Sequence, residues 1–178
     1  FVFVVIGIPL GGPPFFFITG LAGGFGYNRG LVVPPIDGLP QFPLVAAMSS
    51  SSAATAAPLD FLRSMGDAVP MERGSYWFAA GVKFTSFSLV NSQALLYVLL
   101  NRGLEIGLLG MSKFELPPAV PLVSVELALK ARFSTIEGVI SVEARLTDNS
   151  WVLSRDCRLT GGFAFFVWFA GEHAGDFV

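Results

Sequence analysis

Histidine and cysteine are almost absent from this chain of 178 residues, which contains one of each, His173 and Cys157. A single cysteine excludes an internal disulfide framework and says little about the compartment in which the protein works. One histidine and one cysteine cannot form a zinc site alone, because structural zinc sites take four protein ligands. The sequence therefore predicts no metal site and no other cofactor, and it leaves the localisation unknown.

Charged residues are also scarce. They make up 13% of the chain, about half the usual fraction, and the net charge is -2. Proteins that bind nucleic acid carry a basic patch or stripe that neutralises phosphates, and this chain has no such excess of Lys and Arg. We therefore expect no nucleic-acid partner.

Long uninterrupted apolar runs are missing, although the chain is 53% hydrophobic. Before Arg29 there is no charged residue, but Pro9 and the segment 11–14 (GGPP) break the apolar run into pieces too short to span a membrane as helices. No basic region precedes them, as a signal peptide requires. Because the sequence starts at Phe1 and not at a methionine, and ends on apolar residues, we expect both termini to be truncated.

Glycine, phenylalanine and proline are abundant, with 20, 18 and 12 copies, as in proteins rich in strands and turns. The clearest strand pattern lies in 122–147 (LVSVELALKARFSTIEGVISVEARLT), where every second residue from Val123 to Phe133 is apolar. Strict alternation is typical of a strand with one buried face and one face in water. We predict that this segment is a hairpin.

The turn of this hairpin can be placed from the charges. A four-residue loop at 135–138 sets Lys130 opposite Glu143, whereas a two-residue turn sets Lys130 opposite Arg145. Because like charges directly opposite each other are unfavourable, the longer loop is preferred. It pairs Phe133 with Ile140, Ala131 with Val142, Leu129 with Ala144 and Leu127 with Leu146.

Further strand patterns occur along the whole chain, separated by turn signals roughly every ten residues. Residues 93–100 fit a helix or a strand by periodicity alone, and the neighbouring strands favour a strand. Residues 1–8 and 163–170 are apolar on both faces, which predicts strands covered from both sides. The fold class is therefore all-β: an extended antiparallel sheet of about eight to ten strands, curved or layered, in a single β-rich domain over 1–178.

One short helix is expected at 58–66, with Pro58 at its start, Gly66 at its end, and Phe61 and Met65 on one buried face. We expect residues 29–44 to form a loop and the low-complexity Ser/Ala segment 46–58 to form a surface loop.

The glycine-rich stretch 15–28 could in principle cradle a phosphate. It lacks the Gly-Lys-Ser/Thr of a P-loop, and its glycines do not have the dinucleotide-binding spacing ahead of a helix. Small residues at its even positions from Gly20 to Gly26 instead predict a strand with one smooth face that another layer approaches closely.

Catalytic residue types are few. His173 lies between Glu172 and Asp176 and could act as a general base with an orienting carboxylate, but a polar loop between strands explains the same residues. A pair between Cys157 and His173 is conceivable, although nothing marks Cys157 as a nucleophile. We assign no catalytic, cofactor-binding or metal-binding residue, and we do not expect an enzyme.

Three segments carry a resemblance to a known family. They are FITGLAGGFGYNR (17–29) with FPLV (42–45), PLDFL (58–62), and GGFAF (161–165) with WFAGEHAGDFV (168–178). Together they resemble the domain of unknown function 6603, which occurs in very large microbial proteins. The resemblance implies an internal piece of a long, repetitive β-structure, and it implies no catalytic residue.

These observations favour a structural or interaction module whose partner is the rest of a larger polypeptide or protein assembly. A second hypothesis is that lipid or another apolar ligand binds along the apolar face of the sheet. A third is a hydrolase that uses His173 with a nearby carboxylate.

Overall fold

The fold is described from a computed structural model, which covers residues 1–49, 58–118 and 120–178, and of 58–62 only the backbone. Ten antiparallel strands form one sheet. The strands are β1 (Val2–Ile6), β2 (Phe17–Arg29), β3 (Met71–Ser86), β4 (Val90–Leu100), β5 (Leu104–Leu116), β6 (Val123–Ser134), β7 (Val139–Leu146), β8 (Trp151–Val152), β9 (Ser154–Arg158) and β10 (Gly162–Trp168).

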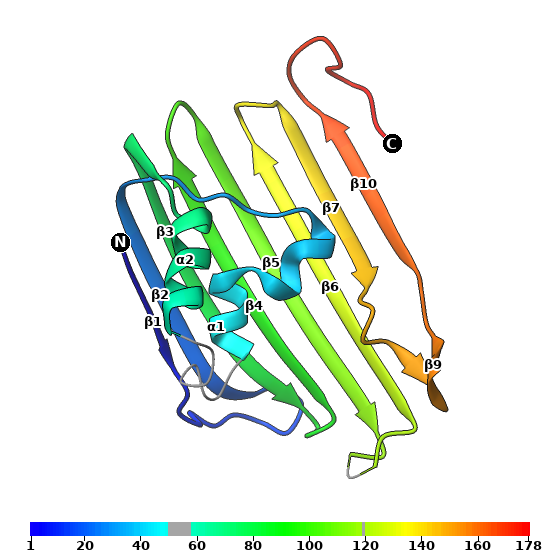
Figure 1. Ribbon diagram of the computed structural model, residues 1–178. Helices are drawn as coiled ribbons and strands as arrows, with labels where there is room; N and C mark the ends of the chain where they lie inside the picture. The colour runs from blue at the N-terminus through cyan, green and yellow to red at the C-terminus, as the bar shows by residue number, and fades with distance from the viewer. Residues whose placement is uncertain (50–57, 119) are drawn as a thin grey trace.

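Eight of these strands lie side by side in the order β1-β2-β3-β4-β5-β6-β7-β10 (Figure 1). The short strands β8 and β9 extend from the end of β6, and Leu153, with a φ of 63°, separates them. Residues 151–158 therefore form two short strands and not one continuous strand. Among the described residues no pairing joins β1 to β10, so the sheet is open and these two strands are its edges. The all-β prediction is confirmed.

The hairpin of β6 and β7 has the predicted register. Phe133 pairs with Ile140, Lys130 with Glu143, and Leu127 with Leu146. Four residues connect the two strands, and Gly138 in this turn has a φ of 64°, a conformation that glycine adopts without a steric cost. Residues 93–100 belong to strand β4, as the neighbouring strands suggested.

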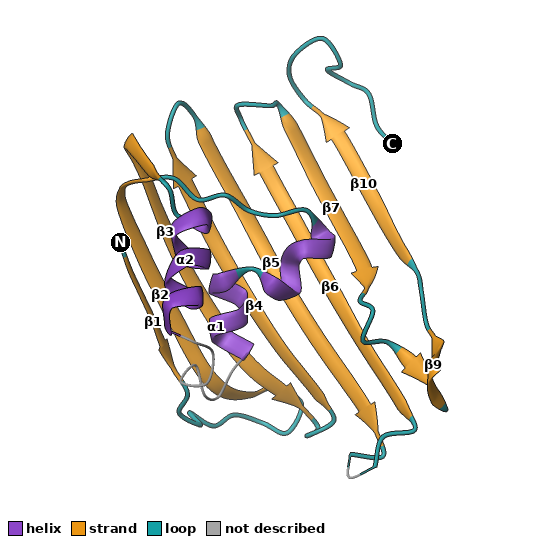
Figure 2. Cartoon of the chain, in the orientation of Figure 1, coloured by secondary structure: helices purple, strands orange, loops and turns teal. Residues whose placement is uncertain are grey.

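Three helices lie on one face of the sheet: η1 (Ile36–Gln41), α1 (Pro43–Ser49) and α2 (Pro58–Ala68) (Figures 1 and 2). The helix expected at 58–66 is α2. The expectation of a loop over 29–44 is wrong for η1 and for the start of α1, which has Pro43 at its first position.

The expected surface loop at 46–58 also needs correction. Residues 46–49 belong to α1, and Met48 is buried. Residues 50–57 lie outside the described part of the chain, as does the side chain of Phe61, while Met65 is buried as expected. Short α1 forms because the sheet gives its apolar side chains a surface to cover, a contribution that local helix signals do not contain.

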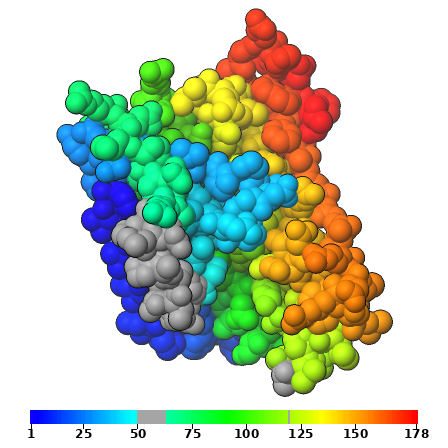
Figure 3. All heavy atoms as spheres, viewed as in Figure 1, coloured from blue at the N-terminus to red at the C-terminus, as the bar shows by residue number. Residues whose placement is uncertain are grey.

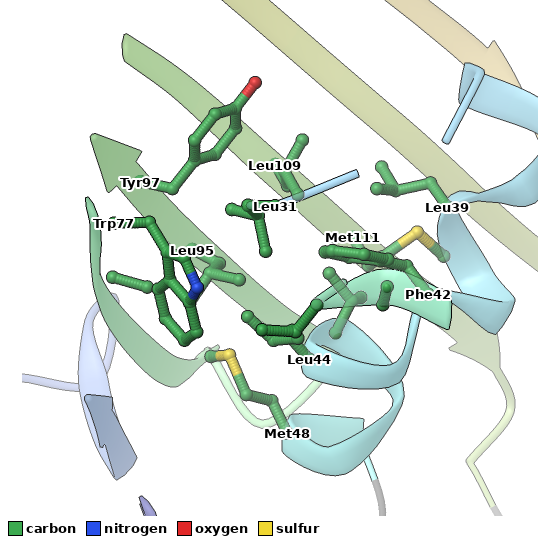
Figure 4. Close-up of a cluster of buried hydrophobic side chains, with 14 of the residues drawn as sticks. Leu31, Leu39, Phe42, Leu44, Met48, Trp77, Leu95, Tyr97, Leu109 and Met111 are labelled. Atoms are coloured by element: carbon green, nitrogen blue, oxygen red, sulfur yellow. The ribbon is translucent and has the colours of Figure 1, made fainter. Parts of the chain in front are cut away.

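The core lies between these helices and strands β2 to β6. Trp77, Leu95, Tyr97 and Leu109 point from three neighbouring strands toward the helices and are fully buried, with Leu44 and Met48 of α1 beside them (Figure 4). The space-filling view from this side shows residues 31–49 lying across the middle of the sheet (Figure 3). We call this side of the sheet the covered face.

Glycines let the largest core side chains lie flat on the strands. A Cβ at Gly26 would lie 2.1 Å from Nε1 of Trp77, and one at Gly107 would lie 2.3 Å from the ring of Tyr97. The smooth face predicted for the glycine-rich segment is therefore real, and the layer that approaches it is the indole of Trp77.

The structure reverses the predicted sidedness of the hairpin. Lys130 and Glu143 point to the covered face, where Lys130 is only 8% exposed, and not into water. The alternating apolar residues of β6 and β7 lie on the opposite side of the sheet. Alternation identified the two faces correctly, but it could not show that the helices lie over the polar one.

The positions of the terminal strands also differ from expectation. Residues 1–8 and 163–170 were expected to be covered on both sides, but β1 and β10 are the two edges of the sheet. Val2 and Phe163 are 62% and 60% exposed. The helices lie mainly over the inner strands, and both edge strands carry exposed side chains, although Phe3 and Val5 of β1 pack against the core (Figure 2).

Candidate functional site

The face opposite the helices, which we call the open face, is apolar across all eight strands. The pairing registers place its side chains in three rows that cross the sheet from β1 to β10. The rows are Val2, Phe25, Phe78, Val98, Ile106, Phe133, Ile140 and Val167; Val4, Gly23, Ala80, Leu96, Leu108, Ala131, Val142 and Phe165; and Ile6, Leu21, Val82, Ala94, Gly110, Leu129, Ala144 and Phe163.

Exposure distinguishes the two faces most clearly on β4. Leu95 on the covered face is 1% exposed, whereas Leu96, its neighbour on the open face of the same strand, is 47% exposed. None of the residues in the three rows is charged, and the polar side chains beside them that the structure describes include Ser92 and Ser112, which hydrogen-bond to each other at 2.9 Å.

The open face is large for an exposed apolar surface. Eight strands about 4.8 Å apart span about 34 Å, and the five residues from the first row to the third span about 17 Å, which gives the three rows alone a flat area of roughly 580 Å². The largest apolar patch on a typical monomer is about 300–600 Å², and a standard protein interface takes about 800 Å² from each partner. The rows alone lie at the upper end of the first range, and the open face continues beyond them on the longer inner strands, where Leu127 is exposed.

Aromatic side chains on the open face contact each other across strands. The ring centroids of Phe25 and Phe78 are 5.0 Å apart, and the rings of Phe133 and Phe169 stack at 5.2 Å. Such pairs stabilise neighbouring strands and fill the space between side chains. The result is a continuous surface, and several hollows of the described structure lie at strand ends and beside the helices.

Polar groups are concentrated on the covered face, where they form a network. The hydroxyl of Tyr97 donates a hydrogen bond of 2.8 Å to Glu105, and Arg132 forms ion pairs with Glu105 and Glu137. Burial, and then the neighbouring Glu105 carboxylate, raise the pKa of Tyr97 above its ordinary value.

Lys130 lies in the same region, beneath the segment that leads into η1. Its ammonium group donates a hydrogen bond of 2.7 Å to the carbonyl of Pro34. Burial lowers the pKa of Lys130, while Glu143 acts in the opposite direction. Arg145, farther along β7, forms an ion pair of 2.8 Å with Asp37 of η1. These contacts hold η1 over the sheet.

His173 lies in the exposed turn that follows β10. Its Nδ1 is 3.3 Å from a carboxylate oxygen of Asp176, and both side chains are about 70% exposed (71% and 67%). Asp176, not Glu172, is thus the carboxylate that the structure brings to the histidine. The shallow hollow beside them, lined by Trp168 and residues 173–178, contains no serine, threonine, cysteine or lysine.

Cys157 is exposed on β9. It precedes β10, whereas His173 follows it, and a strand of seven residues spans roughly 23 Å. The conceivable pair between these two residues is therefore not formed. In the described part of the chain, no group of three or more His, Cys, Asp or Glu residues could hold a metal ion. The described helices are all too short to cross a membrane as an apolar span.

Comparison with protein-family models gives one match, to a family of unknown function, DUF6603, over residues 1–178. The chain belongs to the DUF6603 family. The match covers the whole chain, so the resemblance found in the three sequence segments is confirmed. No curated protein and no solved structure matches the chain.

In this member of DUF6603, sequence reasoning identified the residues of the open face but not their exposure. The alternation from Val123 to Phe133 was read as a buried face, because an apolar face is normally buried. One signal could have suggested otherwise: the polar positions of β5 to β7 carry charges of both signs, which can pair beneath a covering layer. That signal is weak, since a solvated face shows the same pattern.

Proposed function

We propose that this chain is a structural and interaction module, and that its open face packs against another layer of a larger protein or assembly. One observation carries the proposal: three complete rows of uncharged, apolar side chains cross all eight strands without a covering element. An apolar surface of this size is costly in water, at about 25 cal/mol for each Å². Covering it with a second layer recovers that free energy.

The shape of the surface favours a macromolecular layer as the partner. Two sheets stack about 10 Å apart by interdigitating aromatic and branched side chains from regular strands, and the open face has such side chains in register. Small-molecule sites are usually concave. Several hollows of the described structure lie beside the helices and at the strand ends, whereas the middle of the open face is a broad contact surface.

Sedimentation equilibrium of the purified chain tests the proposal. The test variant carries Leu96→Thr, Leu108→Thr and Leu127→Thr, three exposed open-face positions on β4, β5 and β6. We call it the threonine variant; threonine is β-branched and suits a strand, and it replaces an apolar side chain by a smaller polar one. A matched control carries Met71→Thr, Val120→Thr and Ile136→Thr, which are more exposed but lie outside the open face.

The wild-type chain and the control are expected to self-associate, because an uncovered open face can meet a second copy. The threonine variant is expected to associate at least about tenfold more weakly, which corresponds to about 1.4 kcal/mol. Equal association of all three proteins, or a wild-type chain that stays monomeric, would remove the proposal.

A second candidate function is the binding of lipid or another apolar ligand along the open face. The absence of charge from the three rows favours it, because acyl chains bind to continuous apolar surface. Sedimentation with phosphatidylcholine vesicles and mass spectrometry of organic extracts distinguish the two functions. Bound lipid that is lost in the threonine variant supports this candidate, whereas preparations of the wild-type chain without lipid count against it.

A further inference from the structure

The two edge strands of the sheet are its least protected elements. Natural sheets usually guard their edges with charged residues, prolines or bulges, because unpaired backbone groups recruit other strands. Here the inner strands β5, β6 and β7 carry the charges, while β1 (VFVVI) and β10 (GFAFFVW) carry no charge and no proline. Neither edge pairing contains a register shift. The charged residues thus lie on inner strands and are missing from the two edge strands, where natural sheets usually carry them.

The outer edge of β10 already pairs with an added strand over part of its length. Phe166 and Val178 exchange backbone hydrogen bonds of 2.9 and 3.0 Å, and the amide of Trp168 donates to the carbonyl of Asp176 at 3.1 Å. Residues 176–178 thus lie antiparallel to the second half of β10. Within the described residues, the first half, 162–165, has no strand on this side.

Strand direction decides what can complete this edge. Six strands lie between the two edges, and the seven antiparallel pairings that join all eight strands make β1 and β10 run in opposite directions. A β1 strand from a second copy in the same orientation therefore meets β10 antiparallel, which continues the alternation of the sheet. The lengths also match, because β1 has five residues and the unpaired part of β10 has four.

The faces match in the same arrangement. Val2 and Val4 of the second copy lie opposite Phe165 and Phe163, all on the open face, while Phe3 lies opposite Ala164 on the covered face. A slip of one residue would turn the open face of the second copy to the opposite side of the sheet. Figure 1 shows the two edges on opposite sides of the molecule, so each copy leaves one edge free for the next.

We infer that the chain binds a second copy of itself edge to edge, β1 of one copy pairing with the first half of β10 of the next. The arrangement is heterologous, so it extends the sheet and its open face laterally instead of closing a two-fold dimer. The inference rests on the proposed function, because edge pairing would enlarge the open face that the proposed function uses. It concerns a different surface, the two edge strands.

A complementation experiment in the threonine variant tests the inference, because that background weakens association through the open face. Val4→Lys blocks β1, and Ala164→Lys blocks β10; both side chains are exposed, and lysine is a natural edge guard. Ala80→Lys, on the open face of the central strand β3, is the matched control. Circular dichroism verifies that each protein retains its strands.

Each edge-blocked protein alone is expected to sediment as a monomer, while an equimolar mixture of the two forms a dimer. The unblocked parent and the Ala80→Lys control are expected to form larger species as concentration rises. A monomeric parent overturns the inference, and so does dimerisation of the β10-blocked protein alone, which would indicate two-fold pairing of β1 strands. Unchanged association of both blocked proteins also overturns it.

Hydrogen exchange of the parent threonine variant gives a measurement that needs no edge substitution. Amides of 2–6 and 162–165 are expected to become protected together as the concentration rises. If the amides of neither edge become protected, edge pairing is contradicted. The two proposals fail separately: the proposed function fails if the threonine variant associates like the wild type, and the edge inference fails on the blocked variants alone.

Discussion

The ammonium group of Lys130 donates a hydrogen bond of 2.7 Å to the backbone carbonyl of Pro34. This contact joins the centre of β6 to the segment that enters η1, 96 residues earlier in the chain. It places a charged side chain beneath a covering layer, while the apolar residues on either side of Lys130 lie on the open face. The covered face therefore holds buried polar groups beside the hydrophobic core, while the open face is an exposed apolar surface.

Replacement of Lys130 by methionine is expected to change the pH dependence of stability. Because burial lowers the pKa of Lys130 in the folded state, the unfolded chain binds more protons than the folded chain at alkaline pH below 10.5. The wild type should gain stability relative to Lys130→Met as the pH rises toward 10.5. Urea unfolding of both proteins at neutral and alkaline pH measures this difference. A difference in the free energy of unfolding that is the same at neutral and alkaline pH would refute the lowered pKa of Lys130.

Gly26 and Gly23 provide a matched test of the close contact with Trp77. Gly26→Ala places a Cβ against the indole of Trp77 and is expected to lower the free energy of unfolding by about 1–3 kcal/mol. Gly23→Ala, on the open face of the same strand, meets its nearest atom at 4.0 Å and should change stability by less than about 0.5 kcal/mol. Guanidinium unfolding measures both. Equal losses of stability in the two variants would show that β2 needs glycine for its backbone conformation and not for the contact with the indole of Trp77.

Tyr97 is expected to remain protonated until the protein unfolds in alkali. Its raised pKa contributes stability that is present below pH 10.0, the ordinary value, and is lost as the pH rises through the folded-state pKa. Tyr97→Phe removes the hydrogen bond to Glu105 and should cost about 1 kcal/mol at neutral pH. Phenolate absorbance during alkaline titration should show one tyrosine that ionises only on unfolding, and the variant should lack that component. A full phenolate signal from the folded wild type would contradict this account.

Much of the sheet could be predicted from sequence because strand alternation and charge pairing are local signals. The pairing of Lys130 with Glu143 decided the loop length of the β6–β7 hairpin, and every residue pair derived from it is present. The glycine pattern of β2 likewise predicted a closely approached face. The side chain that fills it, Trp77, could not be predicted, since that contact depends on the register between β2 and β3.

The covering layer could not be predicted for a physical reason. η1 and α1 are short, and their stability comes from burying Leu39, Leu44 and Met48 against the sheet, which a local helix signal does not record. Sequence alternation separates two faces, but it contains no information about which face a distant segment covers. For that reason the sequence identified the residues of the open face but predicted that this face is buried.

Thiol reactivity at two neighbouring residues of β6 tests the central claim most directly. In a Cys157→Ser background, Leu127→Cys introduces a thiol on the open face, where Leu127 is 37% exposed, and Ala128→Cys introduces one on the covered face, where Ala128 is 1% exposed. In dilute protein, the thiol at position 127 should react with a maleimide far faster than the thiol at position 128. As the chain associates, the thiol at position 127 should become protected in parallel with the sedimentation mass. A fast reaction at position 128, or association that leaves position 127 fully reactive, would contradict the account.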